Sequence, residues 1–119
     1  MKLNIQAEVG SRCIVAEDGQ RIHDLIIGAL KDGENVFLDF ENVRQFASPF
    51  FNFSVGQLLS DVSEETLRNL LHLENLNDVG RLVVERVIAN ASKYQGNEDY
   101  KKIVDDILER QAKGDADAR

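Results

Sequence analysis

The side chains that could bind a metal ion or act as a nucleophile are few and widely separated in this sequence. His23, His72 and Cys13 stand far apart, without the close ligand spacing of a metal site. We therefore interpret both histidines as boundary or surface residues and expect no metal and no other cofactor. Cys13 lies beside apolar residues, which indicates a small buried thiol rather than a reactive one.

Asp39 is an acid within residues 36–40, the most apolar run that could form a strand. We favour a structural interpretation, in which Asp39 ends the strand and accepts backbone N–H groups from the following loop. The functional alternative is a site acid at the carboxyl edge of the sheet, where ligands gather in open α/β folds.

Ser48 precedes Pro49 at the start of an apolar helical pattern, and this pair is a strong helix-start signal. Our first interpretation is that Ser48 is the N-cap, which stabilises a helix by about 1 kcal/mol. The alternative is a phosphoacceptor. A phosphate would place about −1.5 to −2 charges at the positive end of the helix dipole, where it would change partner binding without unfolding the domain.

The remaining signals of enzymes are missing from the sequence. We find no Gly-x-Gly-x-x-Gly pattern and no glycine-rich loop ending in Lys-Ser/Thr, so a nucleotide cradle has no support. We also find no nucleophile–base pair and no metal set. The sequence therefore predicts a protein that is not an enzyme.

Composition limits the class of protein and its partners. The chain has 119 residues, of which 43% are hydrophobic, which predicts one globular domain. Its net charge of −7 argues against binding to nucleic acid or to an anionic membrane. The single cysteine, the lack of a leader and the lack of a long apolar stretch favour a cytoplasmic location.

The hydrophobic pattern predicts alternating strands and helices. Residues 3–7 and 12–16 are expected to pair as a β-hairpin around a turn at Gly10 and Ser11. Asp18 is expected to cap a helix that ends near Gly33. Its predicted apolar face consists of Ile22, Leu25, Ile26, Ala29 and Leu30.

The second half continues the alternation. After the strand at 36–40 and the helix from Ser48, we expect a short helix from Ser63 that directs Leu67 and Leu70 inward. Residues 71–76 favour a strand. A long helix should follow, capped by Asn77 or Asp78 and ending near Gly96; its packed side is Val79, Leu82, Val83, Val87 and Ile88.

Residues 97–114 are expected to form a final amphipathic helix, which the core requires least. Its Ile103 and Ile107 stripe either docks on its own domain or faces a second copy in a homodimer. The order of elements predicts an α/β fold with a small mixed sheet and helices packed mainly on one face. We assign one domain to residues 1–114 and a disordered tail to 115–119.

Several segments resemble a known family. They are Phe37-Leu38-Asp39-Phe40-Glu41-Asn42-Val43, Phe46-Ala47-Ser48-Pro49-Phe50-Phe51, Val55-Gly56-Gln57-Leu58, Leu73-Glu74-Asn75-Leu76 and Val87-Ile88-Ala89-Asn90-Ala91. Together they look like the prokaryotic STAS-like family of unknown function, over roughly residues 9–94. The resemblance implies a STAS-like α/β fold and, for this chain, a bacterial origin.

STAS domains more broadly include the anti-anti-sigma regulators, in which a serine of the motif Asp-Ser-Ser/Thr-Gly-Leu-Gly is phosphorylated by a partner serine kinase. Aligned on Asp39, that motif falls on Ala47-Ser48-Pro49-Phe50-Phe51, so Ser48 matches the phosphoacceptor. The motif's aspartate is Ala47 here, and its glycine is Phe50. The resemblance thus implies a protein partner, such as a serine kinase or an anti-sigma-like regulator.

These observations together predict a regulatory signalling module that acts by protein–protein binding, with partner switching controlled at Ser48. Asp39, Pro49, Phe50, Phe51 and Asn52 are the residues expected to flank that site. The alternative is a sensor that binds a small ligand between Asp39 and Ser48.

Overall fold

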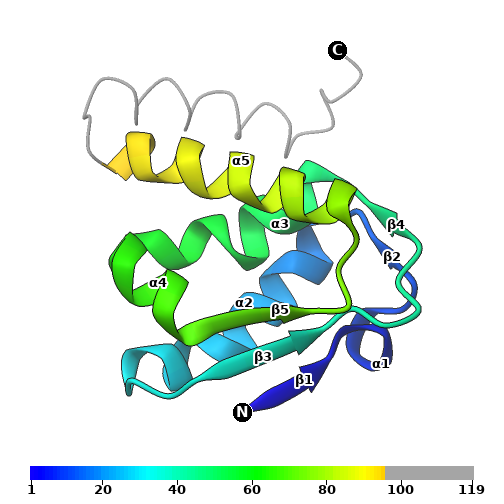
Figure 1. The fold of residues 1–119 in the computed structure, drawn as a ribbon, viewed down its shortest axis with the longest axis horizontal. Coiled ribbons are helices and arrows are strands. Elements are labelled where there is room, and N and C mark those ends of the chain that lie inside the picture. The colour runs from blue at the N-terminus through cyan, green and yellow to red at the C-terminus, as the bar shows by residue number, and fades with distance from the viewer. Residues whose placement is uncertain (96–119) are drawn as a thin grey trace.

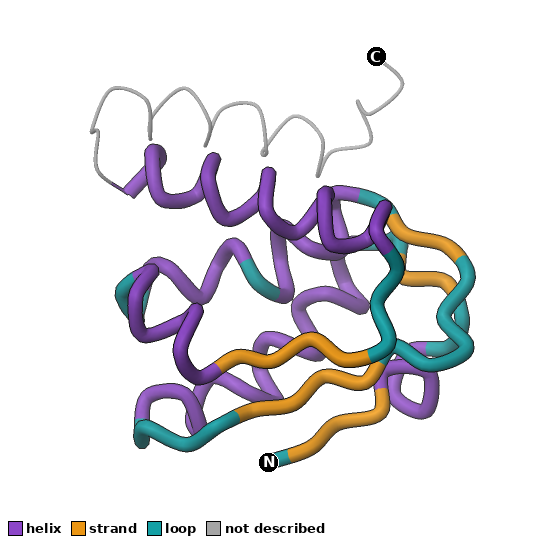
Figure 2. Tube along the Cα trace, viewed as in Figure 1, coloured by secondary structure: helices purple, strands orange, loops and turns teal. Residues whose placement is uncertain are grey.

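A computed structural model of the chain describes residues 1–95 (Figures 1 and 2). The predicted final helix at 97–114 and the tail at 115–119 lie outside the described residues, so the proposed domain boundary stays a prediction. Two small sheets and a set of helices form the described part, which confirms the STAS-like α/β class. The expected mixed sheet is wrong, because all strand pairs among the described residues are parallel.

The larger sheet has three parallel strands in the order β1-β3-β5. They are β1 (Lys2–Asn4), β3 (Val36–Asp39) and β5 (Leu71–Glu74), with Leu3, Leu38 and Leu73 side by side. The second sheet is a ribbon of β2 (Arg12–Cys13) and β4 (Gln45–Phe46), which are also parallel.

The helices lie on one side of the larger sheet (Figure 1). They are α2 (Ala16–Lys31), α3 (Ser48–Ser54), the 3-10 helix η1 (Gly56–Ser60), α4 (Glu64–Leu70) and α5 (Asp78–Gln95). α2 and α4 lie next to the strands, and α5 packs on α3 and η1. The strand residues that face them, such as Val36 and Leu38, are buried in the core. The residues of the other face are polar or half-buried, and Lys2 there pairs with Glu74 at 3.3 Å.

The predicted N-terminal hairpin is wrong. The chain leaves β1 after Asn4 and forms a short helix, α1 (Ile5–Val9), because the Asn4 side chain accepts a hydrogen bond from the Ala7 amide at 2.8 Å and so caps a helix. β1 then pairs with β3, and β2 pairs with β4. Local alternation could not reveal these partners, which lie more than thirty residues along the chain.

The helix starts follow the sequence signals in part. Ser63 caps α4 by accepting from the Thr66 amide, and Asn77 accepts from the Gly80 amide in the first turn of α5. The expected Asp18 cap of α2 is wrong: the helix begins at Ala16, so Asp18 lies in its first turn, where an acid suits the dipole.

The predicted apolar faces are confirmed for Ile22, Ile26 and Leu30 on α2 and for Val87 and Ile88 on α5, all of which are buried. They are wrong for three residues. Leu25 is 39% exposed, Val79 is 66% exposed and Leu82 is 60% exposed. On α5 the buried side runs through Gly80, Val84, Val87 and Ile88, so Val79 and Leu82 fall on the side that points away from the domain.

Two other predicted strands are present, and each is one or two residues shorter than predicted. The strand at 71–76 is confirmed as β5, although it ends at Glu74, and the strand at 36–40 ends at Asp39. Leu67 is buried as expected, and Leu70 packs half-buried against the core. Among the described residues, no helix is both long enough and apolar enough to cross a membrane.

Candidate functional site

The two strands of the β2–β4 ribbon each lead into a helix, and the two helices start next to each other. β2 leads through two residues into α2, and β4 leads through Ala47 into α3. The Ala47 amide continues the ribbon by donating to the Cys13 carbonyl at 3.0 Å. Because the strands are parallel, the first turns of α2 and α3 therefore begin side by side.

Ser48 does not cap α3, so our first interpretation of this residue is wrong. The N-cap is Ala47, which has extended backbone angles (φ −146°, ψ 152°), and no side-chain cap hydrogen bond is present. The pairing of Ala47 with Cys13 holds that residue extended, so the helix takes Ser48 as its first residue and Pro49 as its second. The Ser48 hydroxyl is thus not used to satisfy the helix start.

The side chains of α3 divide into an outer and an inner face, as expected from about 100° of rotation per residue. Ser48 and Pro49 are exposed and Asn52 is half-buried, and we call these three residues the Ser48 face. Phe50 and Phe51 are completely buried on the opposite side. The two phenylalanines that were expected to flank the site therefore fix α3 from beneath rather than contact a partner.

Aromatic rings hold α3 against the sheet and the ribbon. Phe51 lies 6.0 Å from Phe40, which follows β3, and 5.9 Å from Phe46 in β4, measured between ring centroids. Phe50 meets Phe51 edge to face at 5.2 Å. Such offset contacts add about 0.5–1.5 kcal/mol per pair beyond burial, so the first turn of α3 sits on a rigid support.

A close helix crossing fixes α3 from the α2 side. At Gly19, a side-chain Cβ would lie only 2.3 Å from the Phe50 carbonyl oxygen and 3.1 Å from the Phe53 Cβ. The missing side chain of Gly19 thus lets the backbones of α2 and α3 approach each other. Gly19 could not be recognised from the sequence, because an isolated glycine inside a helix does not indicate which residue packs against it.

Cys13, at the end of β2 beneath this junction, is fully buried. Burial, with a smaller contribution from the nearby Asp18 carboxylate, raises the pKa of the Cys13 thiol to about 12. A thiol with such a pKa stays protonated and is a poor nucleophile, which confirms the interpretation of Cys13 as a buried apolar group.

Asp39 connects two loops at the carboxyl edge of the larger sheet. Its Oδ1 accepts hydrogen bonds from the Glu41 amide at 2.9 Å and from the Asn75 side chain at 2.8 Å. The Asn75 hydrogen bond and then the Glu41 amide lower the pKa of Asp39. The structural interpretation of Asp39 is confirmed, since this carboxylate fastens the loop after β3 to the loop after β5.

Asp39 and Ser48 belong to different sheets. Asp39 ends β3 of the larger sheet, whereas Ser48 follows β4 of the ribbon. Within residues 1–95, no hydrogen bond joins the two side chains, and the Ala47 amide next to Ser48 is bonded to Cys13 in the ribbon. The ribbon pairs Cys13 with Phe46, so the same register continued by two residues sets the exposed Val15 opposite Ser48. The expected hairpin did not predict this pairing.

A family model described as a STAS-like domain of unknown function matches residues 18–81. That match covers more than half of the chain. The chain belongs to this STAS-like family. The matched segment runs from the first turn of α2 to the first turn of α5 and includes both Asp39 and Ser48. No curated protein and no solved structure matches significantly.

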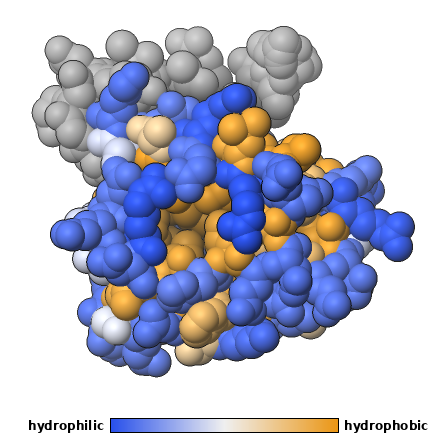
Figure 3. All heavy atoms as spheres, viewed as in Figure 1, coloured by the Kyte–Doolittle hydropathy of each residue, from blue (hydrophilic) through white to orange (hydrophobic). Residues whose placement is uncertain are grey.

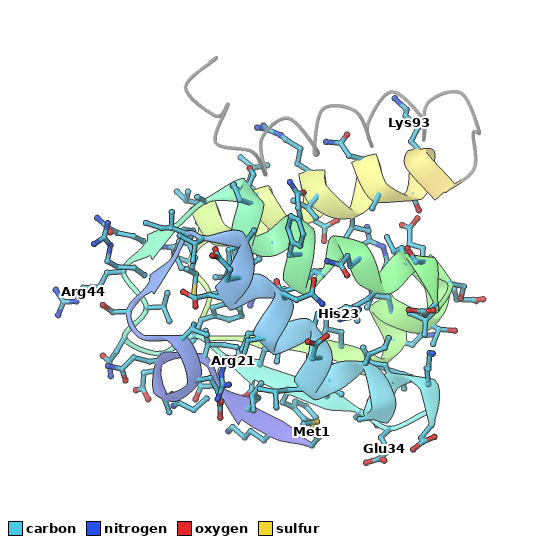
Figure 4. The ribbon with its side chains drawn as sticks, turned by 180° about the vertical axis from the view of Figure 1, so that it is seen from behind. Met1, Arg21, His23, Glu34, Arg44 and Lys93 are labelled. Carbon is cyan, nitrogen blue, oxygen red and sulfur yellow. The ribbon has the colours of Figure 1, made fainter. Side chains whose placement is uncertain are left out.

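The hydrogen bonds of the two histidines of this STAS-like domain join them to residues outside the Ser48 face. His72 faces away from its neighbours Leu71 and Leu73, as expected; it stacks on Phe37 with 4.6 Å between ring centroids and bonds to Asn35. His23 projects from α2, distant from the ribbon end marked by Arg44 (Figure 4). No cluster of three potential metal ligands occurs among the described residues.

Proposed function

We propose that this STAS-like domain is a non-enzymatic regulatory module that binds another protein through the Ser48 face. The family description supports a regulatory protein-interaction role at that coarse level. The observation that supports the Ser48 face in particular is that Ser48 is exposed at the first residue of α3 and makes no cap hydrogen bond. Its hydroxyl is available to a kinase or a partner without loss of a folding contact.

The mechanism we propose is a change of charge on a fixed surface. A phosphate on Ser48 would add about −1.5 to −2 charges at the start of α3. The core contacts of α3 come from Phe50 and Phe51 on its opposite side, so the new charge would leave the fold unchanged. Binding would therefore respond to electrostatics at the surface and not to a rearrangement of the domain.

The partner we propose is a protein of the serine kinase or anti-sigma-like regulator class, and the place of action we propose is the cytoplasm. The partner class follows from the resemblance and from the position of Ser48, and the cytoplasm is favoured by the single cysteine of the sequence. The small-ligand alternative, with a site between Asp39 and Ser48, gains no support from the structure, because Asp39 already bonds to the Glu41 amide and to Asn75.

The test combines three variants of the full chain in affinity capture from the native cells. Ser48→Asp mimics the phosphate, and Asn52→Arg adds bulk and charge to the same face without touching Ser48. Ser63→Asp is the matched control, because it puts the same charge at the start of α4, where aspartate can replace serine as the N-cap.

We expect capture of a partner by the wild type to fall at least about tenfold for Ser48→Asp and Asn52→Arg, as for a charge change at an interface. Ser63→Asp should capture the partner like the wild type. Phosphopeptide mass spectrometry on the protein from native cells should find phosphate at Ser48. Equal capture by the wild type and the three variants would refute partner binding through the Ser48 face. An unphosphorylated Ser48 would refute only control by a kinase.

A further inference from the structure

Two arginines of the β2–β4 ribbon have no partner of opposite charge within residues 1–95. Arg12 lies in β2, and Arg44 directly precedes β4, where its amide donates to the Ser11 carbonyl at 2.8 Å. Both residues are exposed, and Arg44 projects away from the domain (Figure 4). Neither side chain forms an ion pair or a hydrogen bond in this part of the chain. We call Arg12 and Arg44 the ribbon arginines.

Most other cations of the described domain already have partners. Four of them pair with a carboxylate at 3.8 Å or less: Lys2, Arg21, Lys31 and Arg68. Arg81 donates to two backbone carbonyls. The sequence has 21 acidic residues and only 14 lysines and arginines, so carboxylates are in excess. Two exposed arginines without a carboxylate therefore make the ribbon a locally positive surface.

The ribbon arginines lie within reach of a partner that binds the Ser48 face. An extended chain rises about 3.3 Å per residue, so Arg12 lies about 10 Å before Val15, which is set opposite Ser48. Arg44 lies about 13 Å before Ser48 on the same scale. A standard interface covers about 800 Å² on each partner, which is a patch about 30 Å across. A protein centred on Ser48 would therefore also cover the ribbon arginines.

The exposed acid at the start of α2 points away from this surface. Gly19 faces α3, because a Cβ there would meet the Phe50 carbonyl oxygen. Glu17 precedes Gly19 by two residues, which is about 200° around the helix. Glu17 therefore lies on the side of α2 opposite to α3, and it does not neutralise the ribbon arginines.

Apolar side chains lie between the ribbon arginines and α3. Val15 is 46% exposed, and Pro49 is exposed beside Ser48. Polar residues make up most of the face seen in Figure 3, with smaller areas of apolar surface between them. The Ser48 face thus combines an apolar part at Val15 and Pro49 with a positive part at the ribbon.

We propose that the partner of the Ser48 face presents a segment of mixed carboxylate and apolar side chains. Its carboxylates pair with the ribbon arginines, and its apolar side chains cover Val15 and Pro49. A phosphate on Ser48 would repel the same carboxylates, so the modification would release this partner. The inference rests on the function proposed above and adds the chemistry of the partner.

Nuclear magnetic resonance of the isotope-labelled full-length chain tests this chemistry with synthetic peptides. The probe is a short peptide of glutamates and leucines, and the control probe has lysines in place of the glutamates. We expect the glutamate peptide to shift the amide signals of Arg12, Val15 and Ser48. Its affinity should exceed that of the lysine peptide by at least about tenfold, because the ribbon is positive.

Charge reversal identifies the side chains that bind the peptide. The double variant Arg12→Glu with Arg44→Glu should weaken binding of the glutamate peptide by at least about tenfold. Its urea midpoint should stay that of the wild type, because neither side chain has a contact to lose within the described domain. Arg86→Glu is the matched control on α5, where Arg86 is exposed and forms no ion pair within residues 1–95.

Three outcomes would overturn the proposal. They are equal affinity for the two peptides, signal shifts confined to α5, and unchanged peptide binding by the double variant. Affinity capture separates this inference from the function on which it rests. Loss of the partner in Ser48→Asp with full capture by the double variant would refute the acidic segment and leave the Ser48 face standing.

Discussion

The α2–α3 crossing at Gly19 positions the Ser48 face. The substitution Gly19→Ala, which adds one methyl group, tests this close contact. In Gly19→Ala, the new Cβ would lie 2.3 Å from the Phe50 carbonyl oxygen and 3.1 Å from its carbonyl carbon. These atoms belong to the backbone, so no side-chain rotation relieves the clash, and α3 must move away from α2. Gly28→Ala in the same helix is the matched control, because its Cβ meets no atom within 4 Å.

The two variants should change stability in opposite directions. Alanine favours a helix interior over glycine by about 1 kcal/mol, which should appear in full for Gly28→Ala. At Gly19 the same gain is opposed by an overpacking cost of about 3 kcal/mol, so the net loss is about 2 kcal/mol. The gap between the variants is therefore about 3 kcal/mol, or about 12 °C in Tm at about 4 °C per kcal/mol.

Urea unfolding followed by far-UV circular dichroism measures this gap directly. We expect the midpoint to fall for Gly19→Ala and to rise for Gly28→Ala, with equal slopes for the two transitions. If Gly19→Ala is as stable as Gly28→Ala, α2 and α3 do not approach closely at Gly19. The contact that holds α3 and the Ser48 face in place would then also be wrong.

Three further predictions concern single side chains. The buried Ser54 hydroxyl has no hydrogen-bond partner within the described chain, so Ser54→Ala should raise the free energy of unfolding by about 1 kcal/mol. Urea unfolding measures this change, and a lower free energy of unfolding in the variant would contradict the prediction. With its pKa at about 12 instead of 9.0, Cys13 should form about a thousandfold less thiolate at pH near 8 and resist alkylation until the chain unfolds; rapid labelling would contradict its burial. Hydrogen bonds lower the pKa of Asp39 in the folded protein below its ordinary value of 3.8. The ionised carboxylate therefore stabilises the fold at pH values above 3.8, and this stabilisation is lost as the pH falls through the folded-state pKa. Asp39→Asn should therefore be less stable than the wild type at neutral pH, with the gap closing in acid, and urea midpoints that keep a constant gap would argue against this role.

Local signals predicted the parts of the fold that depend on neighbours in sequence. The buried residues Ile22, Ile26 and Leu30 of α2, the Ser63 and Asn77 caps and the strand at β3 all follow from spacing and residue type within a few positions. The family resemblance added the STAS-like fold class, which spacing could not supply. Membership in the STAS-like family confirms that step.

The errors arose where a distant partner decides the local structure. The N-terminal alternation fits a hairpin equally well, but β1 and β2 pair with β3 and β4, and Asn4 starts a helix between them. Ser48 is not the cap of α3, because Ala47 is hydrogen-bonded to the ribbon and becomes the N-cap instead. The exposed Val79 and Leu82 fit the apolar spacing of α5, yet only the packed fold shows which side of that helix meets the core.

The central claim is that a protein partner contacts the Ser48 face of α3, and photo-crosslinking tests that contact most directly. A photoreactive residue at Asn52 would replace a half-buried side chain of the Ser48 face and leave Ser48 intact. The same residue at Ser63 would report on the start of α4. We predict a discrete protein adduct from position 52 in native cells that is absent from position 63; no adduct, or the same adducts from both positions, would contradict the claim.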